Sequence, residues 1–422
     1  MQSLRSRRGL EIAPFRALRY SFANGVTPAA VTAPPYDVLS PDDHRRLLEL
    51  SPHNITHLTL GEKPGGISSY EERKKLLDEW KQQGVLRQDV DPAFYVNVVD
   101  YAVPGSGRGS EATRQRFVGL VALGRLHPFE ESVILPHERT FPKVVDDRLS
   151  LLDATRTNLE SIFLLYSDPA GGIDRLLEAH THGVPLLRVE ARPGEFHEIH
   201  AVSDLALFIR LIVLLGSQKP IIADGHHRYT TSLRFWREGR ERGEAVPGAG
   251  WQMMTFGNLR GGGLSILATH RLVKLHNGTP ADALRLLANR FQAAAPEDAD
   301  LRIETRERSL DVRFPAEIKA SRRGVARTNY ALLHDVVLGE WLREIADEEG
   351  IRYFKEGTGE NDALARGEGD ILFRMKPVDP LEFENVVQGG EVFPHKTTFF
   401  YPKLWSGLLL WPLEEPERLA LK

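Results

Sequence analysis

The chain has 422 residues, a formal net charge of −4, 41% hydrophobic residues and 27% charged residues. This composition is ordinary for a globular protein with one large or two smaller domains, and the negative net charge disfavours nucleic acid as a partner. The sequence has no cysteine, which excludes disulfides, thiolate metal sites and cysteine nucleophiles. No stretch reaches the roughly 18 apolar residues of a membrane helix, and the basic N-terminus lacks an apolar signal core, so we expect a cytoplasmic protein.

The first predicted elements are two helices. Residues 40–50 begin with Ser40 as the N-cap, and Asp43 can close a capping box. Residues 70–83 show a second amphipathic pattern, which Gly84 ends.

Two apolar runs, 94–103 and 116–124, predict a β-hairpin. The glycine-rich stretch 105–109 lies between them. It lacks the helix that must follow a dinucleotide-binding loop, so we interpret it as the hairpin tip.

The remainder alternates short apolar runs with amphipathic segments, which predicts a mixed α/β (α+β) fold. Helices are expected at 204–216, as a buried helix, at 227–241 and at 331–345. The HEIH of residues 197–200 is expected on a solvent-facing strand. Strands are expected at 161–166, 185–190, 196–202, 219–223, 251–257, 264–268 and around 300–314.

A turn and a helix start near residue 276 divide the sequence into two predicted parts. Residues 1–275 form an α/β core. Residues 276–422 form a smaller C-terminal α+β region, whose last aromatic strand segment packs back on the core. The sequence carries no signal for an oligomeric state.

The stretch KPIIADGHHRYTT, residues 219–231, joins a buried strand to a helix through ionisable side chains. If Gly225 makes the turn, the N–H groups of His226, His227 and Arg228 lie unpaired at a helix N-terminus and form an anion site. Arg228 adds a bidentate fork for phosphate, and the histidines can donate to phosphate or move a proton. Asp224 suits a magnesium ligand or an orienter of a histidine or arginine.

A structural alternative exists for this junction. Asp224 would then cap the helix, while the histidines and Arg228 would satisfy buried polar groups. Four ionisable groups within five residues after a buried strand favour the functional interpretation.

Two further segments carry candidate carboxylates. In APPYDVLSPDD, Asp37 lies just before a helix N-terminus. One interpretation is a general base or metal ligand. The other is a turn residue in a rigid connection. In ILPHERTFPKVVDDRLSLL, Glu138 and Arg139 belong either to a site lined by a carboxylate and cations or to a salt-bridged surface loop.

The segment HKTTFFYPKLWSG, residues 395–407, combines Lys396, Tyr401 and Lys403 with further aromatic residues. Lysines beside hydroxyl groups can bind phosphate, and aromatic rings can stack on a base or sugar. The alternative is a packed C-terminal strand with surface lysines.

Together, PPYDVLS, HERT with DRLSLL, ADGHHRY and KTTFFYPKLWSGL resemble an uncharacterised prokaryotic family, the domain of unknown function 1015. The strand–DGHHR–helix element is also similar to the phosphate-binding box of the superfamily of ParB, sulfiredoxin and free serine kinases. This likeness implies a ParB/sulfiredoxin-like nucleotide-binding core. It also implies a phosphate cradle of Gly225, His226, His227 and Arg228, with Asp37 or Glu138 as the base.

This sequence departs from those patterns at three points. Thr230 replaces a frequent family glutamate, which argues against an essential acid there. His395 replaces a frequent glutamine, which weakens a base-reading role for that side chain. Sulfiredoxin chemistry needs a cysteine, and the chain has none.

The function predicted from the sequence is phosphoryl transfer from a nucleotide such as ADP or ATP, or from another phosphate donor. The acceptor is a small hydroxylated metabolite such as serine, or water in a phosphohydrolase. The alternative is a ParB-like nucleotide-binding regulatory protein without turnover. The predicted catalytic residues are Asp37, Glu138, Asp224 and His227, and the predicted Mg²⁺ ligands are Asp224 and Glu138. The predicted phosphate or nucleotide ligands are Gly225, His226, His227, Arg228, Arg139, Lys396, Tyr401 and Lys403.

Overall fold

The computed structural model describes residues 9–22, 25–61, 69–107, 111–244, 246–346, 350–394 and 396–414. By its internal contacts, the chain divides into two compact units. Unit 1 comprises Met1–Ala102, Arg114–Leu264 and Pro402–Lys422, and unit 2 comprises Val103–Thr113 and Ser265–Tyr401.

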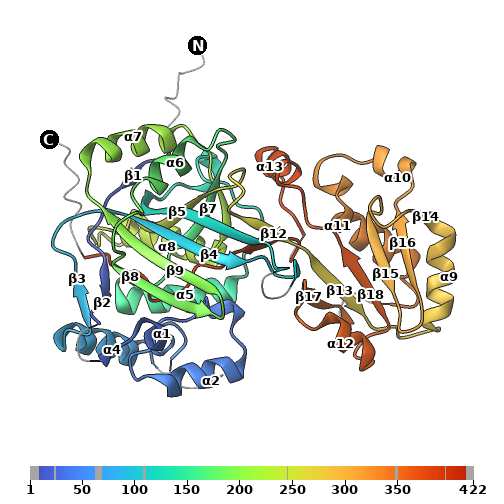
Figure 1. The fold of residues 1–422 in the computed structure, drawn as a ribbon, viewed down its shortest axis with the longest axis horizontal. Helices are drawn as coiled ribbons and strands as arrows, with labels where there is room; N and C mark the ends of the chain where they lie inside the picture. The colour runs from blue at the N-terminus through green and yellow to red at the C-terminus, as the bar shows by residue number, and fades with distance from the viewer. Residues whose placement is uncertain are drawn as a thin grey trace, which may run out of the picture. The chain divides into compact units, whose positions relative to one another are not determined.

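Unit 1 is built on an eight-stranded sheet (Figure 1) with the order β10-β7-β11-β5-β4-β9-β8, in which β1 also pairs with β5. All of these pairings are antiparallel except that of β7 with β11. The strands are β1 (Ile12–Ala13), β4 (Phe94–Ala102), β5 (Arg114–Arg125), β7 (Ile162–Tyr166), β8 (Leu187–Arg192), β9 (Glu195–Val202), β10 (Ile221–Asp224) and β11 (Trp251–Asn258). The short pairs are β2 (Leu18–Tyr20) with β3 (Leu86–Gln88), and β6 (Thr157–Asn158) with β20 (Trp411–Pro412).

Helices surround this sheet, and α5 packs against both α4 and α8. The α-helices of unit 1 are α1 (Pro28–Val31), α2 (Pro41–Leu50), α3 (Thr56–Thr59), α4 (Tyr70–Gln82), α5 (Pro142–Thr155), α6 (Gly172–Glu178), α7 (Leu205–Gly216) and α8 (His226–Glu241). Two short 3₁₀ helices are η2 (Tyr36–Val38) and η4 (Phe129–Glu131).

The sheet is apolar on both faces, because its strands alternate large side chains between two cores. Val96 and Val98 of β4 pack in one core with residues of α6, α7 and α8. Tyr95, the neighbour of Val96, packs in the other core with Leu152 of α5 and Trp411 of β20. The central strands are therefore fixed in register, since a slip by one residue would exchange the two faces.

Unit 2 contains a six-stranded sheet with the order β14-β16-β15-β18-β13-β17 and the separate pair β12-β19. Its strands are β12 (Ser265–Leu267), β13 (Thr269–Val273), β14 (Gln292–Ala293), β15 (Leu301–Glu304), β16 (Ser309–Arg313), β17 (Arg352–Lys355), β18 (Ile371–Met375) and β19 (Phe399–Tyr401). Its helices are α9 (Pro280–Arg290), α10 (Ala316–Ala320), η5 (Gly324–Arg327), α11 (Asn329–Leu332), the π-helix η6 (Leu333–Trp341), α12 (Glu360–Ala365) and α13 (Pro380–Gln388).

The mixed α/β fold predicted from the sequence is confirmed, as are its first two helices and its hairpin. The Ser40 side chain accepts a hydrogen bond of 3.1 Å from the N–H of Asp43 at the start of α2. Strands β4 and β5 pair as the predicted hairpin. Of the predicted hairpin tip, residues 108 and 109 lie outside the described residues.

Three local predictions are wrong. His197 and His200 of the HEIH segment are buried rather than solvent-facing, because both faces of the sheet are covered at β9, and the Trp405 ring lies 6.0 Å from the His197 ring. Helix α7 is not buried all round, since Ile209 and Val213 on its outer side are 51% and 66% exposed. The apolar helix expected at 331–345 ends at Trp341 and is wound as a π-helix from Leu333.

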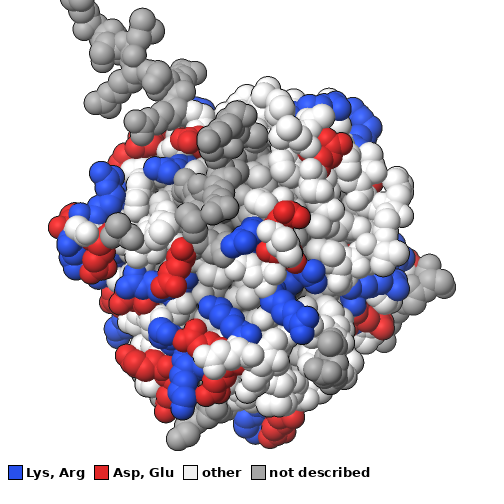
Figure 2. All heavy atoms as spheres, turned by 90° about the vertical axis from the view of Figure 1, so that its left-hand side faces the viewer, with Lys and Arg blue, Asp and Glu red and all other residues white. Residues whose placement is uncertain are grey.

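The predicted division into residues 1–275 and 276–422 stays a prediction. The contact division instead starts unit 2 at Ser265 and returns the chain to unit 1 at Pro402. In the described parts of the chain, no helix combines the length and the apolar composition that a bilayer crossing requires. On the face drawn in Figure 2, acidic and basic side chains are interspersed rather than gathered by sign.

Candidate functional site

The strand–turn–helix element at Asp224 folds as the sequence predicts. Strand β10 ends at Asp224, Gly225 takes the left-handed conformation with φ +93°, and α8 begins at His226. No side chain caps α8, so the alternative in which Asp224 is the helix cap is wrong. The positive end of the dipole of this 16-residue helix therefore faces the site without a carboxylate cap.

The carboxylate of Asp224 pairs with a lysine from the C-terminal segment. Lys403 Nζ lies 2.9 Å from Asp224 Oδ2, and the two side chains are only 11% and 15% exposed. Burial alone would raise the pKa of Asp224. The charges of Lys403 and Arg228 outweigh this effect and hold the pKa well below its usual range. Asp224 is therefore a permanently ionised group in this site.

A second carboxylate, Asp37, reaches the same place from the PPYD segment. It lies on η2 and is exposed to solvent, and it is near enough to Asp224, Lys403 and Arg228 for their charges to act on it. Desolvation, and next the negative charge of Asp224, raise the pKa of Asp37 to about 6, against the lowering effects of Lys403 and Arg228. The two neighbouring carboxylates thus have pKa values shifted in opposite directions.

Arg228 is held rigidly on the first turn of α8. Its Nη1 donates to the carbonyl oxygen of Ser161 at 2.6 Å and lies 3.7 Å from Glu160 Oε2. Its guanidinium also folds back over Gly225, where a Cβ would lie 3.1 Å from Nε. Glu160 in turn accepts a hydrogen bond from the Ser406 hydroxyl. A fixed guanidinium of this kind can recognise an oxyanion with little loss of side-chain entropy.

The C-terminal segment 402–406 connects these loops. Lys403 reaches Asp224, the Ser406 hydroxyl reaches Glu160, and the Ser406 backbone pairs with Ala33, four residues before Asp37. Sequence reasoning proposed Lys403 but missed Glu160 and Ser406. Ser406 lies in the quoted segment HKTTFFYPKLWSG, but nothing local marks it and Glu160 as partners, because 246 positions separate them.

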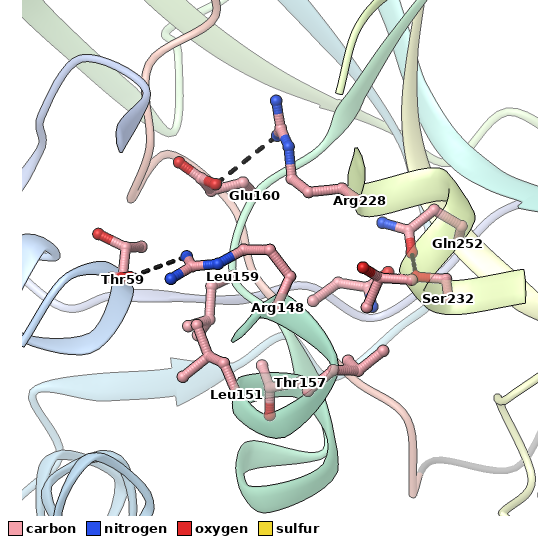
Figure 3. Close-up of a pocket in the computed structure, with 12 residues that line it drawn as sticks. Thr59, Arg148, Leu151, Thr157, Leu159, Glu160, Arg228, Ser232 and Gln252 are labelled. Atoms are coloured by element: carbon pink, nitrogen blue, oxygen red, sulfur yellow. Dashed lines mark hydrogen bonds and ion pairs between the residues drawn. The ribbon is translucent and has the colours of Figure 1, made fainter. Parts of the chain in front are cut away.

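Behind Arg228 lies a cavity of about 50 Å³ (Figure 3), room for only one or two water molecules. Arg148 on its wall donates to the Thr59 carbonyl oxygen at 2.9 Å and stacks its guanidinium 4.5 Å from the centre of the Tyr36 ring. Tyr36 is the neighbour of Asp37, so this contact supports the loop that presents the carboxylate.

The two histidines of the motif hold the HERT segment. The N–H of His137 donates to His226 Nε2 at 3.2 Å, and the N–H of Phe141 donates to His227 Nε2 at 3.0 Å. Because Nε2 of His226 accepts, its Nδ1 carries the proton, and this atom lies 3.2 Å from Glu138 Oε1. Both rings thus have structural partners, and their predicted roles in catalysis and phosphate binding stay predictions.

The contact between His137 and His226 is deeply buried. Desolvation, together with His226, lowers the pKa of His137 to about 3. Its Nδ1 lies 2.5 Å from the Ile222 carbonyl oxygen, so this nitrogen donates and the ring is neutral. His137 therefore joins the HERT segment to strand β10.

Three further predicted ligands stay predictions. Arg139 is exposed beside Glu138. Lys396 and Tyr401 belong to unit 2, where Lys396 Nζ lies 4.8 Å from the centre of the Tyr353 ring. His395 lies outside the described residues.

The contacts of Asp224 and Glu138 bear on the predicted magnesium site. Among the described residues, no group of three or more His, Asp or Glu side chains could hold a metal ion. Asp224 is paired with Lys403, and Glu138 faces His226. These residues therefore do not form a ready-made metal site, and Mg²⁺ bound by Asp224 and Glu138 stays a prediction.

A family model described as a protein of unknown function (DUF1015) matches residues 12–337. The chain belongs to the DUF1015 family. The predicted family is thereby confirmed. The matched range contains Asp37, Glu160, Asp224 and Arg228, whereas Lys403 and Ser406 lie beyond it. No curated protein matches the chain.

Among solved structures, this DUF1015 chain is similar to SbnI with a C-terminal truncation from Staphylococcus aureus. The identity is 13%, the coverage is 69% of this chain and 87% of that chain, and the TM-score is 0.37. A free serine kinase variant in complex with ADP matches at 15% identity, 63% and 83% coverage and a TM-score of 0.32. A conserved hypothetical protein from Pyrococcus furiosus matches at 16% identity, 63% and 86% coverage and a TM-score of 0.31. These TM-scores are too low to assign a function to the DUF1015 chain.

Replacing Gly225 with alanine is expected to destabilise unit 1 by about 1–3 kcal/mol, because φ +93° is strained for any residue with a Cβ. The added methyl would also press on the Arg228 guanidinium. Gly239 on the same helix is the matched control, since its added Cβ would meet nothing closer than 3.9 Å. Urea unfolding should therefore show a loss for G225A and none for G239A. Equal stabilities for the two variants would contradict the strained turn.

Proposed function

We propose that this DUF1015 protein transfers a phosphoryl group from a nucleotide or other phosphate donor, with Asp37 as the general base. The observation that carries the proposal is the pair of carboxylates whose pKa values diverge, raised to about 6 for Asp37 and lowered for Asp224. Such divergence separates a proton-transferring group from a permanently charged one. With a pKa about one unit below neutral, Asp37 is ionised at pH 7 and still basic enough to accept a proton.

The phosphate donor would lie over the first turn of α8. The N–H groups of this turn, the helix dipole and the fixed Arg228 guanidinium supply positive potential on one side of the site. Lys403 supplies a second cation, and Asp224 holds it in place. Phosphoryl transfer depends mainly on such positioning and charge neutralisation.

The proposed step transfers a phosphoryl group to the oxygen of an acceptor hydroxyl. Asp37 takes the proton from an acceptor hydroxyl, and the acceptor oxygen forms a bond to the terminal phosphorus of the donor. The bond between that phosphorus and the bridging oxygen breaks, and the leaving phosphate retains the electron pair. A small hydroxylated metabolite such as serine is the acceptor in a kinase, and water is the acceptor in a phosphohydrolase.

Thermal unfolding with ADP, ATP, CTP, GTP and pyrophosphate, each with and without Mg²⁺, tests the phosphate site. A ligand at 100 times its Kd stabilises the protein by about 2.7 kcal/mol. We expect at least one of these ligands to raise the Tm of the wild type and to lose most of this effect in R228A. The matched control is R234A, an exposed arginine on the same helix, which should respond like the wild type.

The outcomes separate the candidate functions. No shift with any ligand, from a well-folded wild type, would refute the nucleotide site. A shift that R228A retains would refute the position of the phosphate. A shift without turnover of any hydroxylated acceptor or water would favour the regulatory binding protein over the phosphotransferase.

A further inference from the structure

A second cavity, of about 350 Å³, opens along the later turns of α8, away from its N-terminus. This volume is within the range of small-molecule sites in proteins. Basic, aromatic and acidic side chains share its wall. The cavity is lined by Glu11, Arg125, Leu126, His127, Pro128, Glu131, Trp236, Arg237 and Arg240.

Two arginines of this wall are held by tryptophan rings rather than by carboxylates. The guanidinium of Arg125 lies 5.6 Å from the centre of the Trp236 ring and 5.4 Å from that of Trp251. The guanidinium of Arg240 also lies 5.6 Å from the Trp236 ring. In the part of the chain that the structure describes, neither arginine forms an ion pair with a carboxylate. The aromatic contacts therefore orient the two cations without a direct ion pair to a carboxylate.

The third arginine of the wall, Arg237, adds another positive charge. Its only ion pair among the described residues is with Glu130 at 3.9 Å, and both side chains are largely exposed. Such a pair contributes little binding energy. Three guanidinium groups thus face one cavity that has two carboxylates, Glu11 and Glu131, on its wall.

A buried histidine on the same wall has an unpartnered nitrogen. The His127 side chain is 4% exposed, and its Nδ1 lies 2.8 Å from Glu131 Oε2. Nδ1 is placed to donate to this carboxylate, and among the described residues the buried Nε2 has no hydrogen-bond partner. An unsatisfied buried polar atom costs stability, and a hydroxyl or amine entering the cavity could satisfy it.

We propose that this cavity is a second ligand site, separate from the phosphate site at Arg228. Its ligand is a small organic oxyanion. The phosphate or carboxylate group of this ligand binds Arg125, Arg237 and Arg240, and a hydroxyl or amine of the ligand forms a hydrogen bond with His127. Guanidinium forks suit both kinds of oxyanion. The flat Trp236 ring gives the ligand an apolar wall.

The two sites share helix α8. The Tyr229 hydroxyl donates to the His127 carbonyl oxygen at 2.8 Å and accepts from the His127 N–H at 3.0 Å. Tyr229 directly follows Arg228 on the first turn of α8. Tyr229 therefore links the wall of this cavity to the first turn of α8.

Isothermal titration of the full chain with pyrophosphate and, separately, with citrate tests the proposal at fixed ionic strength. The variants are R125Q/R240Q, the milder R240Q alone in case the double variant unfolds, and R234Q as an exposed control on the same helix. We expect the wild type and R234Q to bind at least one of these anions at the cavity. The double variant, and R240Q to a smaller extent, should lose about tenfold or more in affinity there.

Binding of pyrophosphate alone would identify a phosphate ligand, and binding of citrate alone would identify a carboxylate ligand. Either result supports the site if R125Q/R240Q or R240Q weakens the binding and R228A does not. Unchanged affinities for both anions in folded R240Q and R125Q/R240Q would overturn it. The variant R228A separates this proposal from the proposed function. It should keep binding at the cavity, whereas the cavity variants should keep the nucleotide shift that depends on Arg228.

Discussion

Replacing Asp37 with asparagine is expected to lower the rate of phosphoryl transfer by about 10²- to 10⁴-fold, the usual contribution of a general base. Binding of the phosphate donor should persist, because the first turn of α8 and Arg228 remain. A steady-state assay with the nucleotide identified by thermal unfolding measures the first effect. The Tm shift with that nucleotide measures the second.

Asp42, an exposed carboxylate at the start of α2, is the matched control for this substitution. D42N should retain full activity. An active D37N would exclude Asp37 as the base and leave Glu138 as the remaining predicted carboxylate for that role.

The pH dependence follows from the same pKa. Because the pKa of Asp37 is about 6 in the folded protein and near 4 in the unfolded chain, the folded state binds more protons between these values. The contribution of Asp37 to stability is therefore favourable at low pH and declines as the pH rises from about 4 to 6. D37N should thus be more stable than the wild type at pH 7 and lose this advantage near pH 4. Activity should rise with pH through about 6.

Replacing Lys403 with methionine is expected to destabilise the protein by about 3 kcal/mol or more, because it leaves the ionised carboxylate of Asp224 buried without its closest cation. The neutral double variant D224N/K403M should recover much of this loss. Urea unfolding of the wild type, both single variants and the double variant gives the coupling energy.

Lys74, whose exposed ion pair with Asp78 lies on α4, is the matched control. K74M should change stability by less than about 1 kcal/mol. Since the pKa of Asp224 is lowered, the pair stabilises the protein at neutral pH and loses this effect only as the pH falls below the usual range of a carboxyl. A K403M protein as stable as K74M would show that the buried pair adds nothing to the fold.

The local elements of this fold could be predicted from the sequence because their causes are local. Ser40 with Asp43 predicts the start of α2, and the run Ile221–Asp224 followed by glycine predicts β10 and the start of α8. The burial of His197 could not be predicted, since it depends on Trp405, a residue distant in the sequence, covering that face of β9. The open side of α7 was missed for the same reason, because an apolar composition does not specify which side is covered.

The candidate site was predicted as separate motifs, not as an arrangement. Asp37, Asp224 and Arg228 were all proposed, and each motif has its own local signal. No local signal shows which side chain of one motif contacts which side chain of another. Lys403 was proposed as a phosphate ligand, and its contact with Asp224 spans 179 positions. Glu160 and Ser406 were missed because a single glutamate or serine carries information only once its partner is in place.

The return of the chain to unit 1 at Pro402 affects the order of folding. A ribosome makes residues 265–401 of unit 2 before it makes Lys403 and Ser406. Until then, the nascent chain has Asp37, Asp224 and Arg228 but neither the cation for Asp224 nor the hydroxyl for Glu160. Closing so long a loop costs entropy and slows folding. The contact of Asp224 with Lys403 and that of Glu160 with Ser406 can therefore form only late in synthesis, after the chain has been translated through Tyr401.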